Sequence, residues 1–498
     1  CGVPFHAAEG YISKLVQKGY KVAICEQMES VNDSNGPAHR EVVRIVTPGT
    51  VQLNSVLIES ESNYLAAITN VNALFGIAYI DISTAEFKCE VFKSFNDALH
   101  ELQRIQPKEL LVSEEIKDEL PFKHRVPFIP YQLNQASNYL KKYFNITDLS
   151  VFDIQNLKAA FPAIVATLEY VAFTQKGVVA QIRSCKPANV RDYCRLDQGV
   201  LNHLDLFSKK GLFDFINYSK TAMGSRELKR WLRYPLKNME SILDRQNKIR
   251  YFQDNQNHFD MIRASLSSMN DIERTLSKIC SRYDNPRDIL ALRDALNKIP
   301  IIIEQLGAFG DLFFSQYQTL ISIYSSSSAL YNLVGQLNMA LNEDVPNHIR
   351  DGGIFKDGYS KELDELCHSF YDIRQWIKEL EPKCREQYDI KNLKVGFNKV
   401  FGYYIEIPNS QKHKVPDHFI RKQTLTNAER YITPVLKEKE SILLNAKDQQ
   451  SELEKQLYGL LIEQVKTVVP DIQIFSSIIA SLDSIQSLTE VANRHRLV

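Results

Sequence analysis

The sequence contains none of the short motifs that commonly mark an enzyme. It has no G-x-x-x-x-G-K-[ST] phosphate-binding loop and no G-x-G-x-x-G dinucleotide fingerprint. It also lacks H-E-x-x-H, which places zinc ligands on a helix, and G-x-S-x-G, which presents a nucleophilic serine. Its histidines do not cluster at metal-ligand spacing. The residues themselves therefore give no reason to expect catalysis by this chain.

Cysteine pairs and long apolar runs are missing as well. The eight cysteines are scattered and include no Cys-x-x-Cys pair, which argues against a zinc site or a disulfide framework and fits a reducing cytosol. No apolar run approaches the roughly 18 residues that a membrane span requires, and we expect no signal peptide. We therefore expect a cytoplasmic protein with no membrane partner.

The chain has no net charge, because 60 Lys and Arg residues balance 60 Asp and Glu residues. This balance argues against a protein coated in nucleic acid, but it permits localised basic patches. The composition, 44% hydrophobic and 24% charged, is ordinary for a globular protein. A length of 498 residues is too great for one hydrophobic core and predicts three or four domains.

One stretch, residues 393–434, shows strand patterning inside a long run of helical patterning. Apolar and polar residues alternate over 393–397 and again over 403–407, which predicts a β-hairpin with one half-buried face. Residues 391–430 hold eight Lys or Arg against three acids, a local excess of five positive charges. A basic β segment of this kind suits a large polyanion, and duplex nucleic acid is the obvious candidate.

Long helical patterns flank this stretch on both sides. Thr433 and Pro434 form a typical helix start, with a hydroxyl N-cap followed by proline at the first helical position. Apolar residues follow a heptad seam before and after the β segment: Leu363, Leu366, Phe370, Ile373, Ile377 and Leu380, then Leu443, Ala446, Leu453, Leu457 and Leu460. We expect two antiparallel helices that carry the β segment at the tip of a helical arm.

The remainder of the chain predicts two α/β domains followed by helices. Residues 1–49 are typical of part of a small α/β domain, with a helix over 7–18 and strands over 20–26 and 42–46. Residues 50–60 form a linker. Residues 61–185 predict a second α/β domain, with strands over 64–69, 74–82 and 86–92 and a helix over 95–105. From about residue 190 the pattern is mostly helical, so the fold class is multidomain α/β plus mainly α.

Three polar residues of the α/β domains, Asp81, His6 and Arg44, could have either a functional or a structural role. Asp81 could belong to a metal-dependent nuclease, but such a site needs three or four converging acids and no convincing partners are present, so a turn-forming role is favoured. His6 could satisfy a loop, and Arg44 could be solvated. On the residues alone, these structural interpretations are preferred to functional ones.

Long motifs, in a fixed order, resemble the MutS family of DNA mismatch repair proteins. The segments GVPFHA, GYISKLVQKGYKVAICEQ and REVVRIVTPGT resemble the family's mismatch-recognition domain. LDQGVLNHLDLF and TAMGSRELKRWLRYPL resemble its core, and KVGFNKVFGYYIEI and RKQTLTNAERYITP resemble its clamp. Together these motifs span almost the entire chain.

This resemblance implies a domain order. A partial mismatch-recognition domain covers 1–49, a linker 50–60, and a ribonuclease H-like connector 61–185. Core and lever helices cover 190–385, the clamp covers 386–432, and returning core and lever helices cover 433–498. The clamp is thus inserted between two core helices, in agreement with a basic β tip on a helical arm.

The resemblance also implies partners and cofactors. They are duplex DNA containing a mismatch, a second copy of the full-length protein, and a downstream repair factor of the MutL type, in a bacterial cytoplasm near the nucleoid. ATP and Mg²⁺ serve the full-length family member, and no cofactor is expected in this chain. The family's Phe-x-Glu motif is expected upstream of Cys1, and its ATPase domain beyond Val498. We therefore expect a chain that holds DNA but carries neither the base-wedging aromatic nor the ATPase.

Positions in the clamp motifs imply which side chains contact phosphates. They are Asn398, Lys399, Arg421, Lys422, Thr424 and Asn427, with Lys412 and Lys414 on the adjoining loop. Asn398 could equally be a turn residue, and Asn427 a helix cap. In the first domain, the resemblance implies that His6 and Arg44 line the DNA-facing side. Gly224 and Arg226 of the core motif are expected to be structural. The principal alternative is a scaffold whose helical arm binds partner helices, for which the apolar arm positions matter and the basic tip positions do not.

Overall fold

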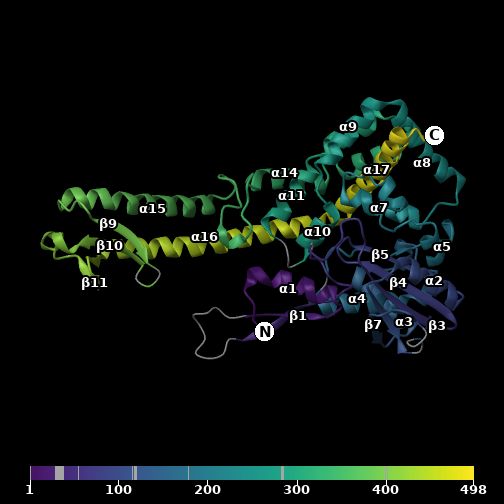
Figure 1. The fold of residues 1–498 in the computed structure, drawn as a ribbon, viewed down its shortest axis with the longest axis horizontal. Coiled ribbons are helices and arrows are strands. Elements are labelled where there is room, and N and C mark those ends of the chain that lie inside the picture. Colours follow the sequence, from purple (N-terminus) through teal and green to yellow (C-terminus); the bar gives the residue numbers. More distant parts are fainter. Residues whose placement is uncertain are drawn as a thin grey trace. The chain divides into compact units, whose positions relative to one another are not determined.

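The computed structural model of the chain describes residues 2–27, 39–53, 55–114, 116, 120–177, 179–281, 285–398, 400 and 402–497. The chain divides into two compact units, and Figure 1 shows the elements of each. The first unit contains residues 1–284, 291–334 and 464–498, and the second contains residues 285–290 and 335–463. Each unit has hydrophobic clusters of its own, so each is described separately.

The first unit begins with a small α/β segment. Helix α1 (Phe5–Gln17) precedes two antiparallel strands, β1 (Val22–Gln27) and β2 (Arg40–Val46). Val16 of α1 and Val46 of β2 are buried in one cluster with Val51 and Leu53 of the segment that follows. The helix and the two strands predicted for this segment are confirmed.

A six-stranded sheet forms the centre of the next segment. Strands β3, β4 and β5 form an antiparallel meander, β6 pairs parallel with β3, β7 pairs parallel with β6, and β8 pairs parallel with β5. The order across the sheet is β7-β6-β3-β4-β5-β8. The strand bounds are β3 (Tyr64–Val71), β4 (Leu74–Asp81), β5 (Glu86–Phe92), β6 (Glu109–Ser113), β7 (Arg125–Phe128) and β8 (Lys186–Pro187).

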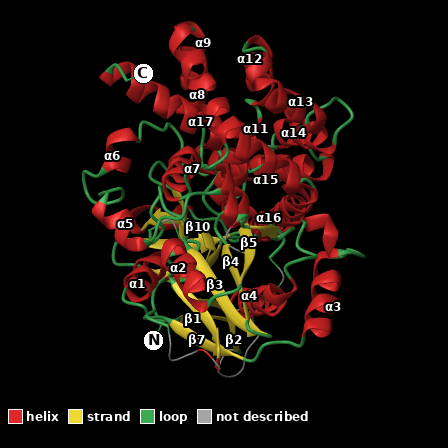
Figure 2. Cartoon of the chain, turned by 90° about the vertical axis from the view of Figure 1, so that its right-hand side faces the viewer, coloured by secondary structure: helices red, strands yellow, loops and turns green. Residues whose placement is uncertain are grey.

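Helices cover both faces of this sheet (Figure 2). Alternate residues of a strand point to opposite faces. Leu65 and Ile80 therefore pack with α3 (Leu133–Phe144) and α4 (Phe161–Gln175), whereas Ile68 packs on the other face with α2 (Phe95–Ile105). Burial on both faces explains why β3 and β4 are apolar nearly throughout.

The rest of the first unit is helical, as predicted. Helix α17 (Val469–His495) is buried along much of its length and packs against α7, α8 and α9. The other helices from residue 198 to residue 340 are α5 (Gln198–His203), α6 (Leu212–Ile216), α7 (Ala222–Arg233), α8 (Met239–Asp254), α9 (Gln256–Ser267), α10 (Ile272–Cys280), α11 (Pro286–Leu296), α12 (Ile299–Ala308), α13 (Phe314–Ile323) and α14 (Ala329–Ala340).

A buried carboxylate joins α17 to the start of α7. Asp483 of α17 accepts hydrogen bonds from the backbone N–H groups of Lys220 and Thr221, both within 3.0 Å, and from the Thr221 hydroxyl at 2.7 Å. Thr221 is the N-cap of α7 and in turn accepts the N–H of Gly224. A Cβ at Gly224 would collide with Asp483, so glycine permits the close approach of the two helices. Gly224 therefore has the structural role expected of it.

Arg226 of α7 also has the expected structural role. It is buried, and its guanidinium makes two 2.8 Å hydrogen bonds to the Asp271 carboxylate and one of 2.7 Å to Glu273. Paired, planar hydrogen bonds of this kind are the geometry that makes arginine effective in buried ion pairs. The contact fixes α7 against the start of α10.

The second unit contains two long helices and a four-stranded antiparallel sheet. Helices α15 (Lys361–Gln387) and α16 (Pro434–Thr467) run side by side, with the sheet at one end of the pair (Figure 1). With a rise of about 1.5 Å per residue, the 27 residues of α15 extend about 40 Å. The strands, in the order β11-β12-β10-β9, are β9 (Lys394–Asn398), β10 (Gly402–Pro408), β11 (Ile420–Thr424) and β12 (Ala428–Ile432). The predicted hairpin is confirmed as β9 and β10, and a second hairpin, β11 and β12, completes the sheet.

The predicted seam of α16 is correct at its start and wrong further along. Leu443 and Ala446 are buried, but Leu460 is 62% exposed, whereas Tyr458 and Leu461 are buried in its place. A straight helix drifts by about 20° per heptad relative to a strict seven-residue repeat, so after two or three heptads its buried stripe has rotated by roughly 40–60° and shifts onto neighbouring residues. Glu454, which no apolar pattern can detect, occupies one turn of this stripe and accepts the N–H groups of Gly353 and Ile354 at 3.0 and 3.1 Å.

Within the described residues, no single helix has the length and apolar character needed to cross a bilayer. The consecutive helices α16 and α17 reach those limits only when they are taken together.

Replacing the Asp483 carboxylate with an amide of the same shape should destabilise the first unit. In Asp483→Asn one acceptor oxygen becomes a donor that faces the N–H groups of Lys220 and Thr221. Leaving a buried donor unsatisfied costs about 1–3 kcal/mol. We expect the free energy of unfolding to fall by that amount in urea denaturation. Glu304→Gln, at an exposed position of α12, is the matched control and should change it by less than about 0.5 kcal/mol. Equal midpoints for the two variants would contradict the capping role.

Candidate nucleic-acid interface

The four-stranded sheet is fixed to both long helices through one of its faces. Ile405 and Ile407 of β10 and Tyr431 of β12 are buried against Ile377 of α15 and Leu443 of α16. The helix start predicted at Thr433 is confirmed, because its hydroxyl accepts the N–H of Leu436 at 3.1 Å and α16 begins at Pro434. A sheet held in this way is a rigid platform for the side chains on its rim.

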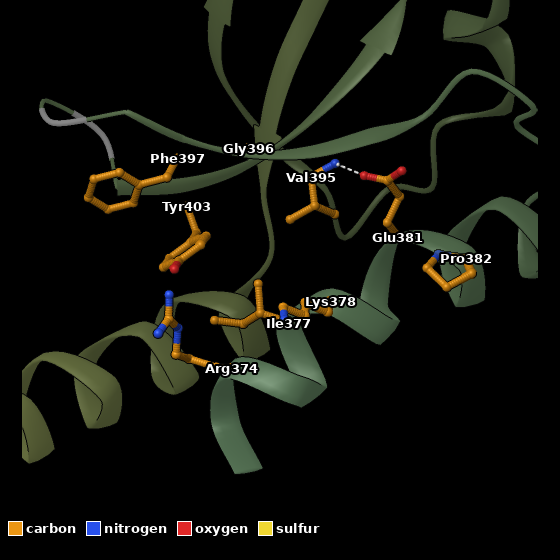
Figure 3. Close-up of a pocket in the computed structure, with 9 residues that line it drawn as sticks. All are labelled: Arg374, Ile377, Lys378, Glu381, Pro382, Val395, Gly396, Phe397 and Tyr403. Atoms are coloured by element: carbon orange, nitrogen blue, oxygen red, sulfur yellow. Dashed lines mark hydrogen bonds between the residues drawn. The ribbon is translucent and has the colours of Figure 1, made fainter. Parts of the chain in front are cut away.

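Two carboxylates on the helices accept backbone N–H groups of the sheet. Glu440 of α16 is buried and accepts the N–H of Tyr403 at 3.0 Å. Its approach requires Gly402, which has a φ of +76° and leaves no room for a Cβ beside the carboxylate. Glu381 of α15 accepts the N–H of Val395 at 2.8 Å (Figure 3). Both ends of the β9–β10 hairpin are therefore connected to a helix.

A cavity of about 380 Å³ lies between α15 and the β9–β10 hairpin (Figure 3). Ile377 and Val395 contribute apolar side chains to its wall, and Arg374 and Lys378 contribute positive charge. None of the residues predicted to contact phosphate lines it.

The basic residues near β11 gather around one buried acid. Glu429 of β12 is 3% exposed and lies 2.7 Å from Lys412 Nζ and 3.5 Å from Arg421 Nη1. Hydrogen bonds from Lys412 and from the Tyr431 hydroxyl lower the pKa of Glu429, so this carboxyl group stays ionised at neutral pH. Burial and the hydrogen bond to Glu429 raise the pKa of Tyr431 to about 12. More than half of each cationic side chain remains exposed, so Lys412 and Arg421 are anchored by Glu429 and still face water.

A β-bulge displays the next basic residue. Arg421 pairs with Tyr431 and Gln423 pairs with Arg430, which leaves Lys422 as the extra residue of β11. A bulge of this kind interrupts strand pairing and redirects side chains, and β11 is an edge strand. Lys422, Thr424 and Asn427 are all exposed. We name the five predicted residues on this side of the sheet the β11 edge cluster: Lys412, Arg421, Lys422, Thr424 and Asn427.

The other predicted clamp residues lie elsewhere. Asn398 accepts the N–H of Val400 at 2.7 Å and therefore acts as the turn residue that the sequence allowed. The strand registers place its turn at the opposite end of the sheet from the turn that contains Asn427. Lys414 binds Asp389, through the backbone oxygen at 2.8 Å and the carboxylate at 2.5 Å. Lys399 is outside the described residues. Asn427 belongs to a strand turn, so its interpretation as a helix cap is wrong.

Arg430 was counted in the positive excess of residues 391–430, but the sequence did not predict what it contacts. Its guanidinium lies 2.9 Å from the Glu406 carboxylate and 4.3 Å from the centre of the Tyr404 ring, on the face of the sheet opposite Tyr431. Glu406 and Arg430 are directly opposed on β10 and β12. The pairing of strands that are not consecutive in the sequence is needed to see this, because only the register brings the two charges together.

Of the two residues predicted in the first domain, the structure places Arg44 differently from expectation and does not test the DNA-facing role of His6. His6 lies within α1, and its side chain is outside the described part of the chain. Arg44 of β2 is 4% exposed, and burial lowers its pKa to about 9. The expectation of a solvated Arg44 is therefore wrong, and a guanidinium in this position does not present its charge to a duplex. The alternation of β2 predicted a strand but did not predict that helix α4 would pack against it.

Asp81 has the turn-forming role that the sequence favoured. It is fully buried, and its carboxylate accepts the N–H of Asn63 and the N–H and hydroxyl of Ser83, all within 2.8 Å. All of these are contacts that hold a turn in place. Among the residues that the structure describes, no group of three or more His, Cys, Asp or Glu side chains could hold a metal ion.

Comparisons with known proteins match the chain along its length. Family models described as MutS domain I, MutS domain II and MutS domain III match residues 1–55, 63–183 and 198–489. The chain is 36% identical to a DNA mismatch repair protein MutS from Halothermothrix orenii, over 99% of this chain and 56% of that protein. It is 37% identical to one from Staphylococcus epidermidis, over 100% of this chain and 56% of that protein. The chain thus spans a little more than half the length of these relatives.

The close contact between Glu440 and Gly402 can be tested by substitution, with a control on α16, the helix that carries Glu440. Gly402→Ala adds a Cβ that collides with the buried Glu440 carboxylate and strains a positive φ, so we expect the second unit to lose about 1–3 kcal/mol of stability. Gly459→Ala adds a Cβ to an exposed position of α16 with open space around it, and should stabilise by up to about 1 kcal/mol. Thermal unfolding followed by circular dichroism measures the melting temperature, which should fall in Gly402→Ala and rise in Gly459→Ala. Shifts of the same sign in both variants would contradict the structural role of the Glu440–Gly402 contact.

Proposed function

Because this chain belongs to the MutS family, we propose that it serves DNA mismatch repair by holding duplex DNA that contains mispaired or unpaired bases. The observation that carries the proposal is the β11 edge cluster. Lys412, Arg421 and Lys422 face solvent on the rim of a rigid sheet, although the chain as a whole has no net charge. Positive charge concentrated in this way supports contact with a polyanion.

The proposed contacts are to the phosphate backbone rather than to the bases. Lysine, arginine, threonine and asparagine side chains donate hydrogen bonds to phosphate oxygens, and such contacts orient a protein on a duplex without reading its sequence. Neutralising phosphates releases bound counterions, so binding should weaken steeply as salt is added. Asn398 is proposed as a secondary contact, because its turn lies at the end of the sheet opposite the turn of Asn427 and suits a second stretch of backbone. Lys414 and Lys399, the latter outside the described residues, are proposed as further contacts on the resemblance alone.

The proposed division of the chain follows the resemblance. We assign residues 1–49 to a partial mismatch-recognition domain, 50–60 to a linker, 61–185 to the connector, 190–385 and 433–498 to the core and lever, and 386–432 to the clamp. An antiparallel meander β3-β4-β5 extended by parallel β6 and β7, with helices on both faces, supports a ribonuclease H-like connector. The sheet of β9 to β12 between α15 and α16 supports the clamp.

Further properties are proposed for the whole protein of which the relatives are examples. They are a homodimer that closes around DNA as a sliding clamp, a downstream repair factor of the MutL type, ATP hydrolysis with Mg²⁺, and a location in the bacterial cytoplasm near the nucleoid. Among the described residues, no group of three or more His, Cys, Asp or Glu side chains could hold a metal ion. ATP and Mg²⁺ are therefore proposed only for the whole protein.

Reversing two charges of the β11 edge cluster should weaken DNA binding. We expect Arg421→Glu combined with Lys422→Glu to reduce the affinity for duplex DNA at least tenfold. The slope of log K against log salt should fall by about 2, because two phosphate contacts are lost. Fluorescence anisotropy with a labelled duplex over a series of salt concentrations measures both quantities. The same loss should be seen for several unrelated duplex sequences, since the contacts read no bases.

The control variant carries the same change in net charge away from the sheet. Lys361→Glu combined with Lys447→Glu alters exposed positions of α15 and α16 and should leave the affinity within about threefold. An unchanged affinity and salt slope in the Arg421 and Lys422 variant would remove the clamp assignment. That outcome would favour the alternative of a scaffold whose helical arm binds partner helices.

Removing the anchoring charge should have the opposite effect on binding. In Glu429→Gln, Lys412 and Arg421 lose the acid that compensates their charge, so we expect duplex affinity to rise about threefold to tenfold and the salt slope to steepen. The stability of the sheet should fall, because the buried Tyr431 hydroxyl and Lys412 lose a charged acceptor. The anisotropy titration and a urea denaturation measure the two effects, and a weaker affinity would show that Glu429 positions these cations for DNA instead of restraining them.

A further inference from the structure

A cavity in the first unit gathers positive charge from three parts of the chain. It measures about 50 Å³ and lies where residues 60–62, which precede β3, meet residues 105–108 after α2 and helix α7. Five cationic side chains line it: Lys108, Arg226, Lys229, Arg230 and Arg233. Only one acid, Glu61, belongs to the lining.

Two of the five cations are neutralised by acids outside the cavity. Arg226 pairs with Asp271 and Glu273, and Arg230 makes two hydrogen bonds to Glu227. The three that remain, Lys108, Lys229 and Arg233, face Glu61 alone. Counted together, the five cations face four acids, Glu61, Asp271, Glu273 and Glu227, so the site has an excess of one positive charge.

Glu61 shows that this environment favours an anion. Its carboxylate lies 2.8 Å from Lys229 Nζ and 3.9 Å from Lys108 Nζ. Partial burial by itself raises the pKa of Glu61, but Lys229, Lys108 and Arg233 together outweigh it and lower the pKa. The cations thus stabilise negative charge more than desolvation penalises it.

The guanidinium of Arg233 can donate further hydrogen bonds. Its Nε is buried and has no hydrogen-bond partner among the described residues. One terminal nitrogen donates to Gln106 Oε1 at 3.5 Å, the limit of a hydrogen bond, and the guanidinium lies 5.1 Å from the centre of the Phe207 ring. Ser60 and Ser62 add hydroxyl groups to the same lining. Donors of this kind, around an excess of positive charge, are the groups that bind phosphate oxygens.

We propose that this cavity binds a single phosphate group, carried by free orthophosphate or by a nucleotide. A phosphate monoanion balances this excess charge in full. One water molecule requires roughly 10–15 Å³ of cavity space, so a cavity of about 50 Å³ admits one small anion and leaves any nucleoside outside. The bound phosphate connects α7 with residues 60–62 before β3 and residues 106–108 before β6, and so fixes α7 against the six-stranded sheet.

Isothermal titration calorimetry with the 498-residue chain tests this directly. Orthophosphate is titrated at constant ionic strength maintained with chloride, and AMP is titrated in a second arm. We expect saturable binding of orthophosphate by the unaltered protein. Arg233→Gln and Lys108→Gln should each weaken it about tenfold or more, because each removes a charged donor. Lys108 is half exposed, so its variant keeps the test valid if Arg233→Gln fails to fold. Arg250→Gln, at an exposed position of α8 outside the cavity, should bind like the unaltered protein.

The outcomes distinguish free orthophosphate from a nucleotide as the ligand, and they decide whether the proposal holds. Competition between AMP and orthophosphate supports one phosphate site with the nucleoside in solvent. Binding of AMP alone, weakened by Arg233→Gln, assigns the site to nucleotides. No saturable binding of either probe, or equal affinities in the unaltered protein and both cavity variants, would overturn the proposal. The site lies in the first unit, so a failure here leaves the β11 edge cluster untouched.

Discussion

A carboxylate that leaves water costs several kcal/mol unless hydrogen-bond donors surround it. This chain satisfies that constraint repeatedly with backbone N–H groups from distant segments, and its architecture depends on the result. The buried acids and their backbone donors are Asp483 with Lys220 and Thr221, Glu454 with Gly353 and Ile354, Glu440 with Tyr403, and Asp81 with Asn63. Each contact fixes the end of one element against the side of another. Such contacts are directional, so they determine where helices and turns meet, whereas apolar burial alone determines only which faces are hidden.

Local periodicity predicted most of the elements, because each has a buried face and a regular repeat. The mainly helical character after residue 190, the strands β3, β4, β5, β9 and β10 and the Thr433 cap follow from patterns within a few residues, whereas β7, β8, β11 and β12 were not predicted. What periodicity missed depends on contacts between distant segments. The buried stripe of α16 passes through Glu454 and Leu461 because the helix turns at its own pitch. Arg44 is buried by a helix more than a hundred residues away, and the separation of Asn398 from Asn427 depends on which strands pair.

The sequence showed the candidate site as an excess of positive charge. It did not show which of these cations are paired with acids. Counting cations over residues 391–430 selected this segment as the candidate surface. It could not show that Glu429 lies at the centre of the β11 edge cluster, or that Lys414 and Arg430 are engaged by Asp389 and Glu406. The cations thus form two classes, some restrained by acids and some, such as Lys422, presented by a bulge. Only three-dimensional pairing separates them.

Both edges of the four-stranded sheet are closed to further strands. On β9, the outward N–H of Val395 is already bound by Glu381, so an incoming strand would find that donor taken. On β11, the bulge at Lys422 breaks the regular spacing of donors and acceptors and surrounds the edge with positive charge. Bulges, charged side chains and covered donors are the means by which natural sheets resist edge-to-edge aggregation. Edge-to-edge pairing of this sheet with the same sheet in another copy of the chain, the first step of fibril formation, is therefore disfavoured.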